Sequence, residues 1–141
     1  MTGRKAQFGL MFMFLGCLAA NGVVVVLNGA DVFPDELQAS LLKILSIYSV
    51  PLAAILGGIF AQRKKISGAS AGECWAALTV AAFWNLLLLW RTFALLFSEH
   101  DTISDLMKYL ESISSAASFL IVGVLAYFFG KSAHELDKET E

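Results

Sequence analysis

The sequence predicts an all-α, polytopic integral membrane protein that crosses the bilayer four times and keeps both ends on the cytoplasmic side. Of its 141 residues 57% are hydrophobic and only 16% are charged, whereas soluble domains have about 25% charged residues. Four apolar runs approach or exceed the roughly 20 residues that a spanning helix needs. Every second segment that flanks these runs is rich in lysine and arginine. Residues 1–141 are therefore expected to form a single membrane domain.

The first two spans are expected at residues 8–27 and 41–61. The first follows Arg4 and Lys5, the kind of start that a cleaved signal peptide also has. Its apolar run is longer than the roughly 7–15 residues of a signal peptide core, which favours a retained span. Pro51 interrupts the second run and predicts a kink there.

The last two spans are expected at residues 74–97 and 113–130. Ser70 and Glu73 form a capping-box pattern just before the third run and mark the start of its helix. A mixed polar stretch that contains Thr102 and Asp105 precedes the fourth run, so its helix is expected to begin at the outer surface. Residues 131–141 form a charged cytoplasmic tail that is compatible with a short helix.

Orientation follows from the basic residues near the span ends, which favour the cytoplasmic side. The segments assigned to that side contain Arg4, Lys5, Arg63, Lys64, Lys65 and Lys131. The two remaining connections are rich in Asp and Glu. Lys108, between the third and fourth runs, is the only lysine or arginine in them. We expect a multi-pass protein of the plasma membrane, which is the inner membrane in a Gram-negative cell.

Arg91 is the most informative single residue, because it lies inside an otherwise apolar span. Intramembrane charges face a bundle interior or a wet cavity and find partners. Glu111 is expected at a similar depth, so the sequence predicts an Arg91–Glu111 ion pair, with Asp105 or Asp101 as substitute acids. The alternative is that Arg91 extends to the outer interface. Lys43 is either a further ion-pair candidate or a boundary anchor.

Other polar residues lie within the spans. Asn21 and Asn85 fall near the middle of the first and third runs, where interhelical hydrogen bonds are the simplest expectation. Asn85 shares a helical face with Thr92. An alternative expectation is that this face lines a cavity between copies of the chain. Ser115 and Ser118 form a polar stretch in the fourth span that predicts either a vestibule or helix packing.

The pattern disfavours several function classes. A net charge of −2 without a basic stripe argues against nucleic-acid binding. Cys17 and Cys74 lack metal-ligand spacing, and His100 and His134 have no catalytic constellation around them. We expect no metal site, no cofactor and no enzymatic activity.

The leading functional hypothesis is a small homo-oligomeric pore or ion channel, because four helices leave little room for a pathway inside one chain. In outline the chain resembles compact membrane effectors of bacterial defence or toxin systems, being small and nearly all membrane. The alternative is a non-conducting assembly or binding subunit of a larger membrane complex. A four-span transporter is weaker, because the first span has no acidic residue. A cytoplasmic protein or small ligand that triggers the protein is expected to act at the tail, at the loop of Arg63, Lys64 and Lys65, or in a crevice between copies.

Overall fold

Four long helices make up the structure, a computed structural model that describes residues 3–29, 33–61, 70–97 and 102–138. They are α1 (Gly3–Asn28), α2 (Pro34–Ala61), α3 (Ala71–Leu95) and α4 (Ile103–Lys138). Each contains a segment long and apolar enough to cross a membrane. The predicted all-α architecture with four helices of membrane-spanning length is confirmed.

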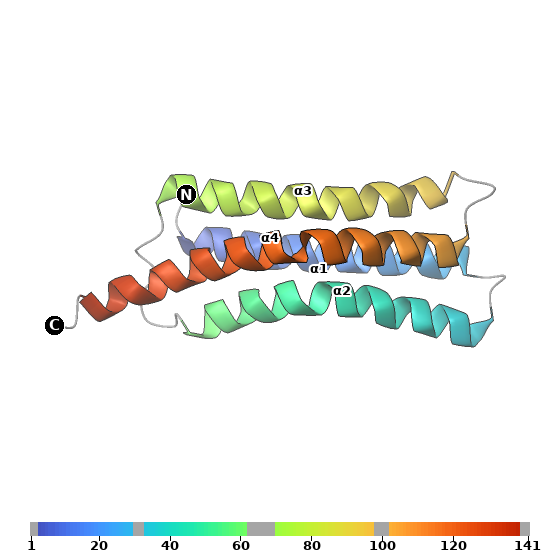
Figure 1. The fold of residues 1–141 in the computed structure, drawn as a ribbon, viewed down its shortest axis with the longest axis horizontal. Helices are drawn as coiled ribbons and strands as arrows, with labels where there is room; N and C mark the ends of the chain where they lie inside the picture. Colours follow the sequence, from blue (N-terminus) through green and yellow to red (C-terminus); the bar gives the residue numbers. More distant parts are fainter. Residues whose placement is uncertain (1–2, 30–32, 62–69, 98–101, 139–141) are drawn as a thin grey trace.

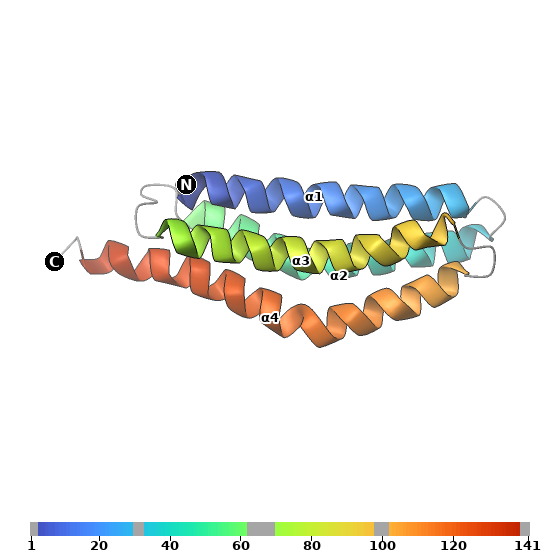
Figure 2. The same cartoon turned by 90° about the horizontal axis from the view of Figure 1, so that it is seen from above.

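The helices pack as an elongated bundle with their axes roughly aligned (Figure 1). Helix α1 packs against α2 and α3, and α4 packs against the same two helices. The order around the bundle is therefore α1, α2, α4, α3, with α1 opposite α4 and α2 opposite α3. Two views at right angles show α4 on the side of the bundle away from α1 (Figures 1 and 2).

All four helices begin before their apolar runs, and the difference is largest for α2 and α4. Helix α2 begins at Pro34 rather than at residue 41, and α4 begins at Ile103 rather than at residue 113. Proline suits the first position of a helix, where its missing N–H is not needed. The 36 residues of α4 correspond to about 54 Å at 1.5 Å per residue, well beyond a hydrocarbon core of roughly 30 Å. Residues 131–138 of the predicted tail continue this helix.

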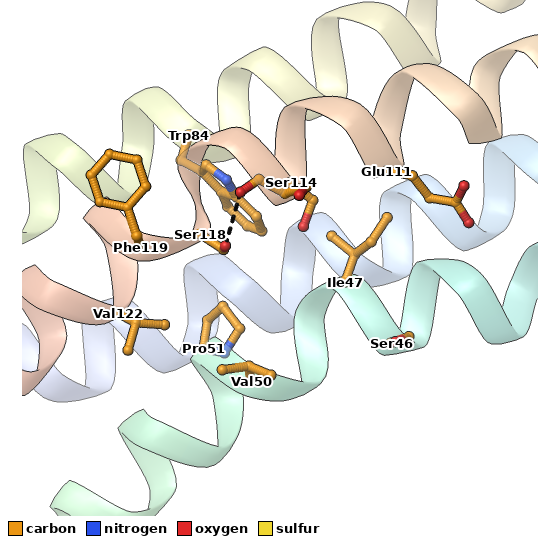
Figure 3. A pocket seen from close by; sticks show the side chains of 11 residues that line it. Ser46, Ile47, Val50, Pro51, Trp84, Glu111, Ser114, Ser118, Phe119 and Val122 are labelled. Atoms are coloured by element: carbon orange, nitrogen blue, oxygen red, sulfur yellow. Dashed lines mark hydrogen bonds between the residues drawn. The ribbon is translucent and has the colours of Figure 1, made fainter.

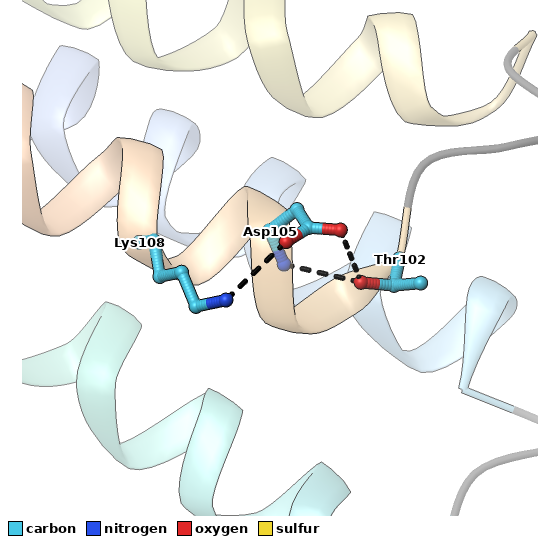
Figure 4. A network of polar contacts seen from close by, with 3 residues as sticks. All are labelled: Thr102, Asp105 and Lys108. Atoms are coloured by element: carbon cyan, nitrogen blue, oxygen red, sulfur yellow. Dashed lines mark hydrogen bonds and ion pairs between the residues drawn. The ribbon is translucent and has the colours of Figure 1, made fainter.

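Polar side chains mark the starts of α3 and α4. Ser70 Oγ accepts a hydrogen bond from the Glu73 amide at 3.3 Å, and the Glu73 carboxylate accepts one from the Ser70 amide at 2.8 Å. The predicted capping box is confirmed. At α4, Thr102 Oγ1 accepts from the Asp105 amide at 3.2 Å and donates to its carboxylate at 2.7 Å (Figure 4). Lys108 contacts the same carboxylate at 3.4 Å.

Aromatic side chains fill the middle of the bundle. Phe14 of α1, Tyr48 of α2 and Trp84 of α3 are each at most 2% exposed. The ring centroids of Tyr48 and Trp84 are 5.4 Å apart, and Phe14 lies 6.3 Å from Tyr48 and 5.6 Å from Trp84. Because Tyr48 and Trp84 come from opposite helices, their contact crosses the bundle axis. The axis of one protomer is thus filled at this level.

Candidate functional site

A groove between α2 and α4 is the candidate functional site (Figure 3). Its volume is about 480 Å³, within the range of roughly 300–1,000 Å³ typical of small-molecule sites. The residues that line this α2–α4 groove are Ser46, Ile47, Val50, Pro51, Trp84, Glu111, Ser114, Ser115, Ser118, Phe119 and Val122. Its wall therefore combines serine hydroxyls and one carboxylate with apolar side chains.

Bends in both helices explain why the groove forms there. Pro51 lies inside α2 and has no N–H, so the Ile47 carbonyl lacks its usual partner one turn later. Helix α2 is bowed in Figure 1, as a proline within a helix predicts. Helix α4 bends near its middle, away from the other helices (Figure 2). Ser118 Oγ donates to the Ser115 carbonyl at 3.2 Å, and such serine contacts often bend helices.

Trp84 forms the base of the groove and extends from α3 toward α4. Figure 3 shows its indole nitrogen on the side of the ring that faces the serines of α4. The Trp84 side chain is 2% exposed, and its Nε1 has no hydrogen-bond partner among the residues that the structure describes. A buried donor without a partner costs about 1–3 kcal/mol. The base of the groove therefore has unused capacity to donate a hydrogen bond.

An ion pair joins α2 and α4 beside the groove. Lys43 Nζ lies 2.9 Å from Glu111 Oε1, and both side chains are about half exposed, at 47% and 48%. The predicted Arg91–Glu111 pair is therefore wrong, because Glu111 faces α2 and pairs there. Lys43 is an ion-pair residue rather than only a boundary anchor.

Arg91 instead lies against the α3-facing side of α4. Its guanidinium carbon is 5.7 Å from the centre of the Tyr109 ring, a distance suited to a cation–π contact. Tyr109 and Glu111 are two residues apart, so they project about 200° from each other around the helix. The Asp105 carboxylate, one predicted substitute, contacts Thr102 and Lys108. Asp101, the other substitute, lies outside the described residues.

Asn21 is the centre of a buried network that links three helices. Its Nδ2 donates to the Tyr48 hydroxyl of α2 at 2.8 Å and to the Cys17 carbonyl of α1 at 2.9 Å. Its Oδ1 accepts a short hydrogen bond from Thr92 Oγ1 of α3. The expectation of interhelical hydrogen bonding at Asn21 is confirmed.

The face of α3 that includes Asn85 and Thr92 is buried inside the protomer. Asn85 is 2% exposed and Thr92 is fully buried, so this face does not line a cavity between copies. Asn85 Nδ2 donates to the Ala81 carbonyl of its own helix at 2.8 Å. Its Oδ1 has no hydrogen-bond partner within the described chain, and the predicted interhelical bond is not formed there.

The structure brings some predicted site residues together and leaves others apart. Ser115, Ser118 and Glu111 meet in the groove, whereas Asn21, Asn85, Thr92 and Arg91 do not line it. The loop of Arg63, Lys64 and Lys65 lies outside the described residues. Sequence reasoning missed Ser46 and Trp84, which show no distinguishing pattern along the chain. It also missed the role of Tyr48, whose hydroxyl within an apolar run was an available signal.

Exchanging the charges of Lys43 and Glu111 tests their pairing. Lys43→Glu or Glu111→Lys alone places like charges side by side at the membrane and should lower the amount of folded protein. The double variant restores the pair and should recover most of that loss. Size-exclusion profiles of the membrane-extracted protein measure the effect. The matched control is the double variant Arg91→Glu with Glu111→Arg. Recovery of folded protein in this control but not in the Lys43–Glu111 exchange would contradict the Lys43–Glu111 ion pair.

No group of three or more histidine, cysteine or acidic residues is placed to hold a metal ion in the described ranges. Comparisons of this chain with protein-family models, curated proteins and solved structures gave no match.

Proposed function

We propose that copies of this chain assemble into a small membrane pore whose pathway runs along the α2–α4 face, the outward surface of these two helices on either side of the groove. The supporting observation is a concentration of outward-facing polar side chains on this face, within the candidate membrane-spanning segments of α2 and α4. They are Lys43, Ser46, Ser49, Glu111, Ser112 and Ser115, all exposed in the single protomer.

The opposite side of the bundle differs in character. The outward side chains of α1 and α3 include Phe12, Leu27, Phe83 and Trp90, which are 67%, 67%, 64% and 77% exposed. Apolar and aromatic surface of this kind suits direct contact with lipid. Helices α2 and α4 also expose apolar side chains, such as Leu45, Val50 and Phe119, so the two sides differ in the charged and serine side chains that the α2–α4 face adds.

A water-filled space between copies is the environment that best fits the α2–α4 face. Charged side chains placed against hydrocarbon are costly and usually face a bundle interior or a wet cavity. The interior of this protomer is filled by Phe14, Tyr48 and Trp84, which leaves the space between copies. Cyclic symmetry repeats the serines and the Lys43–Glu111 pair around an axis, as pore linings do.

The proposal includes the orientation and the membrane. Basic residues in the first turn of α1 and between α2 and α3 favour a cytoplasmic position for both chain ends. The plasma membrane is the proposed location. A cytoplasmic protein or small ligand that binds the connecting loop or the end of α4 is the proposed trigger.

Thiol modification during current recording tests the proposal. In a background with Cys17 and Cys74 replaced by serine, purified protein in planar bilayers should give unitary currents. Ser115→Cys should be modified by a charged methanethiosulfonate reagent, and modification should reduce the current severalfold. Ala19→Cys on the outward side of α1 is the control and should not respond. Absence of current, or an equal response at both positions, would count against a pathway along α2 and α4.

A non-conducting assembly subunit is the second candidate, favoured by small residues on the same two helices. Ala53 and Gly57 of α2 are exposed, as is Gly123 of α4. A Cβ added at Gly57 or Gly123 would meet no atom within 4 Å. Open small-residue surface allows close approach of another helix. A defined complex that carries no current in the bilayer experiment would favour this candidate.

A further inference from the structure

We propose that each protomer binds one phospholipid with an ethanolamine headgroup between α2 and α4. The phosphate lies between Lys43 and Lys108, and one acyl chain follows the α2–α4 groove. The site lies within a single protomer and overlaps the α2–α4 face, because Lys43, Glu111 and Ser115 belong both to that face and to the cavities.

A second cavity supports the position of the headgroup. It has a volume of about 460 Å³ and lies between the beginnings of α2 and α4, where its lining includes Glu36, Ser40, Lys43, Thr102 and Lys108. We call it the outer cavity. The first turns of both helices lie at the same end of the bundle (Figure 1), and the inference places the headgroup at that end. The ammonium groups of Lys43 and Lys108 supply the donors that a phosphate needs, because the Ser40 and Thr102 hydroxyls already donate to Glu36 and Asp105.

Both lysines retain capacity to donate to a phosphate. Lys108 is 73% exposed, and its contact with Asp105 is long, at 3.4 Å (Figure 4). Lys43 uses its ammonium group on Glu111 at 2.9 Å, and an ammonium group has three donors. Charge-assisted hydrogen bonds from two lysines on different helices would hold a phosphate across the gap.

The local charges favour a zwitterionic headgroup over an anionic one. Lys43 and Lys108 are accompanied by Glu36 in the lining and by their partners Glu111 and Asp105. Two positive and three negative groups leave a net negative charge, which disfavours a lipid whose headgroup is only anionic. A primary ammonium group beside the phosphate complements the carboxylates and brings three donors of its own.

The groove has the depth and the character to receive an acyl chain. Ile47, Val50, Phe119 and Val122 supply apolar contact along it. From Lys108 to Val122 the helix rises about 21 Å at 1.5 Å per residue, while one leaflet of the hydrocarbon core is roughly 15 Å deep. The Lys43–Glu111 pair joins the two cavities, because Lys43 lines the outer cavity and Glu111 lines the groove. A lipid that enters sideways from the bilayer would lie across both.

Native mass spectrometry of the full chain, released from mild detergent, tests the inference. The probes are palmitoyl-oleoyl phosphatidylethanolamine, the matching phosphatidylglycerol and phosphatidylcholine, the matching diacylglycerol, and free phosphoethanolamine. We expect one phosphatidylethanolamine per chain to be retained in preference to the others. Lys108→Ala should weaken this retention about tenfold, the effect of losing one hydrogen bond to a charged group. Lys5→Ala removes an exposed lysine at the other end of the bundle and should leave retention unchanged.

A photoreactive phosphatidylethanolamine with a diazirine on its acyl chain locates the site. Labels on the groove residues of α2 and α4 would support the inference, and Val122→Trp should reduce them by filling the groove. Labels mainly on α1 or α3 would overturn it. So would stronger retention of phosphatidylglycerol, equal retention of diacylglycerol, or competition by free phosphoethanolamine as effective as that of the whole lipid. A normal helical circular dichroism spectrum shows that each variant is folded.

Discussion

Trp84→Ala is expected to lower the free energy of unfolding by about 3–5 kcal/mol, the usual cost of removing a large buried aromatic side chain. Trp84 fills the bundle axis between Phe14 and Tyr48 and forms the base of the groove. The two neighbouring rings cannot collapse fully into the space, because they come from different helices. Unfolding in mixed detergent micelles, followed by circular dichroism, measures the change.

Trp90→Ala is the matched control, because Trp90 lies on the same helix but is 77% exposed. Substitutions at exposed positions usually change stability by less than about 0.5 kcal/mol. Equal losses at Trp84 and Trp90 would contradict the packing of the aromatic cluster.

Asn21→Ala is expected to cost about 1–3 kcal/mol, because the buried Tyr48 hydroxyl loses its donor from Asn21 and the Thr92 hydroxyl is left with the Leu88 carbonyl of its own helix. A double-mutant cycle with Tyr48→Phe isolates the bond between α1 and α2. We expect a coupling energy of about 1 kcal/mol, as for other hydrogen bonds between membrane helices. The same unfolding assay supplies all four corners of the cycle.

Asn28→Ala provides the comparison within α1. Asn28 Nδ2 donates to the Val24 carbonyl of its own helix at 2.8 Å, so its loss frees no group on another helix. Its effect should be well below that of Asn21→Ala. Strictly additive effects of Asn21→Ala and Tyr48→Phe would argue against the network.

The hydropathy pattern is sufficient to predict the four helices, because lipid requires long apolar segments with internally satisfied backbones. It does not predict where a helix ends. Helix α4 continues past the fourth apolar run to Lys138, because the hydrogen bonds of a helix do not depend on apolar side chains. The start of α3 is easier to predict, because Ser70 and Glu73 together form a recognisable capping box there.

Rotation about the helix axis is what the sequence leaves open. Arg91 and Glu111 were assigned similar depths, yet Glu111 faces Lys43 on α2 and Arg91 lies against Tyr109. Depth follows from position along the chain, whereas the direction of a side chain depends on how the helices are turned against each other. The groove was not predicted for the same reason, because it depends on how the helices are turned against each other. Ser115 and Ser118 were recognised as polar, but their meeting with Pro51 and Trp84 requires the packing of three helices.

Disulfide crosslinking in native membranes tests most directly whether the α2–α4 face meets its counterpart in another copy. In the background without Cys17 and Cys74, Ser112→Cys is compared with Phe83→Cys, both at exposed positions. Mild oxidation should convert most of the Ser112→Cys protein to a disulfide-linked dimer and leave the Phe83→Cys protein monomeric. A dimer formed through Phe83→Cys, with Ser112→Cys still monomeric, would contradict the proposed assembly.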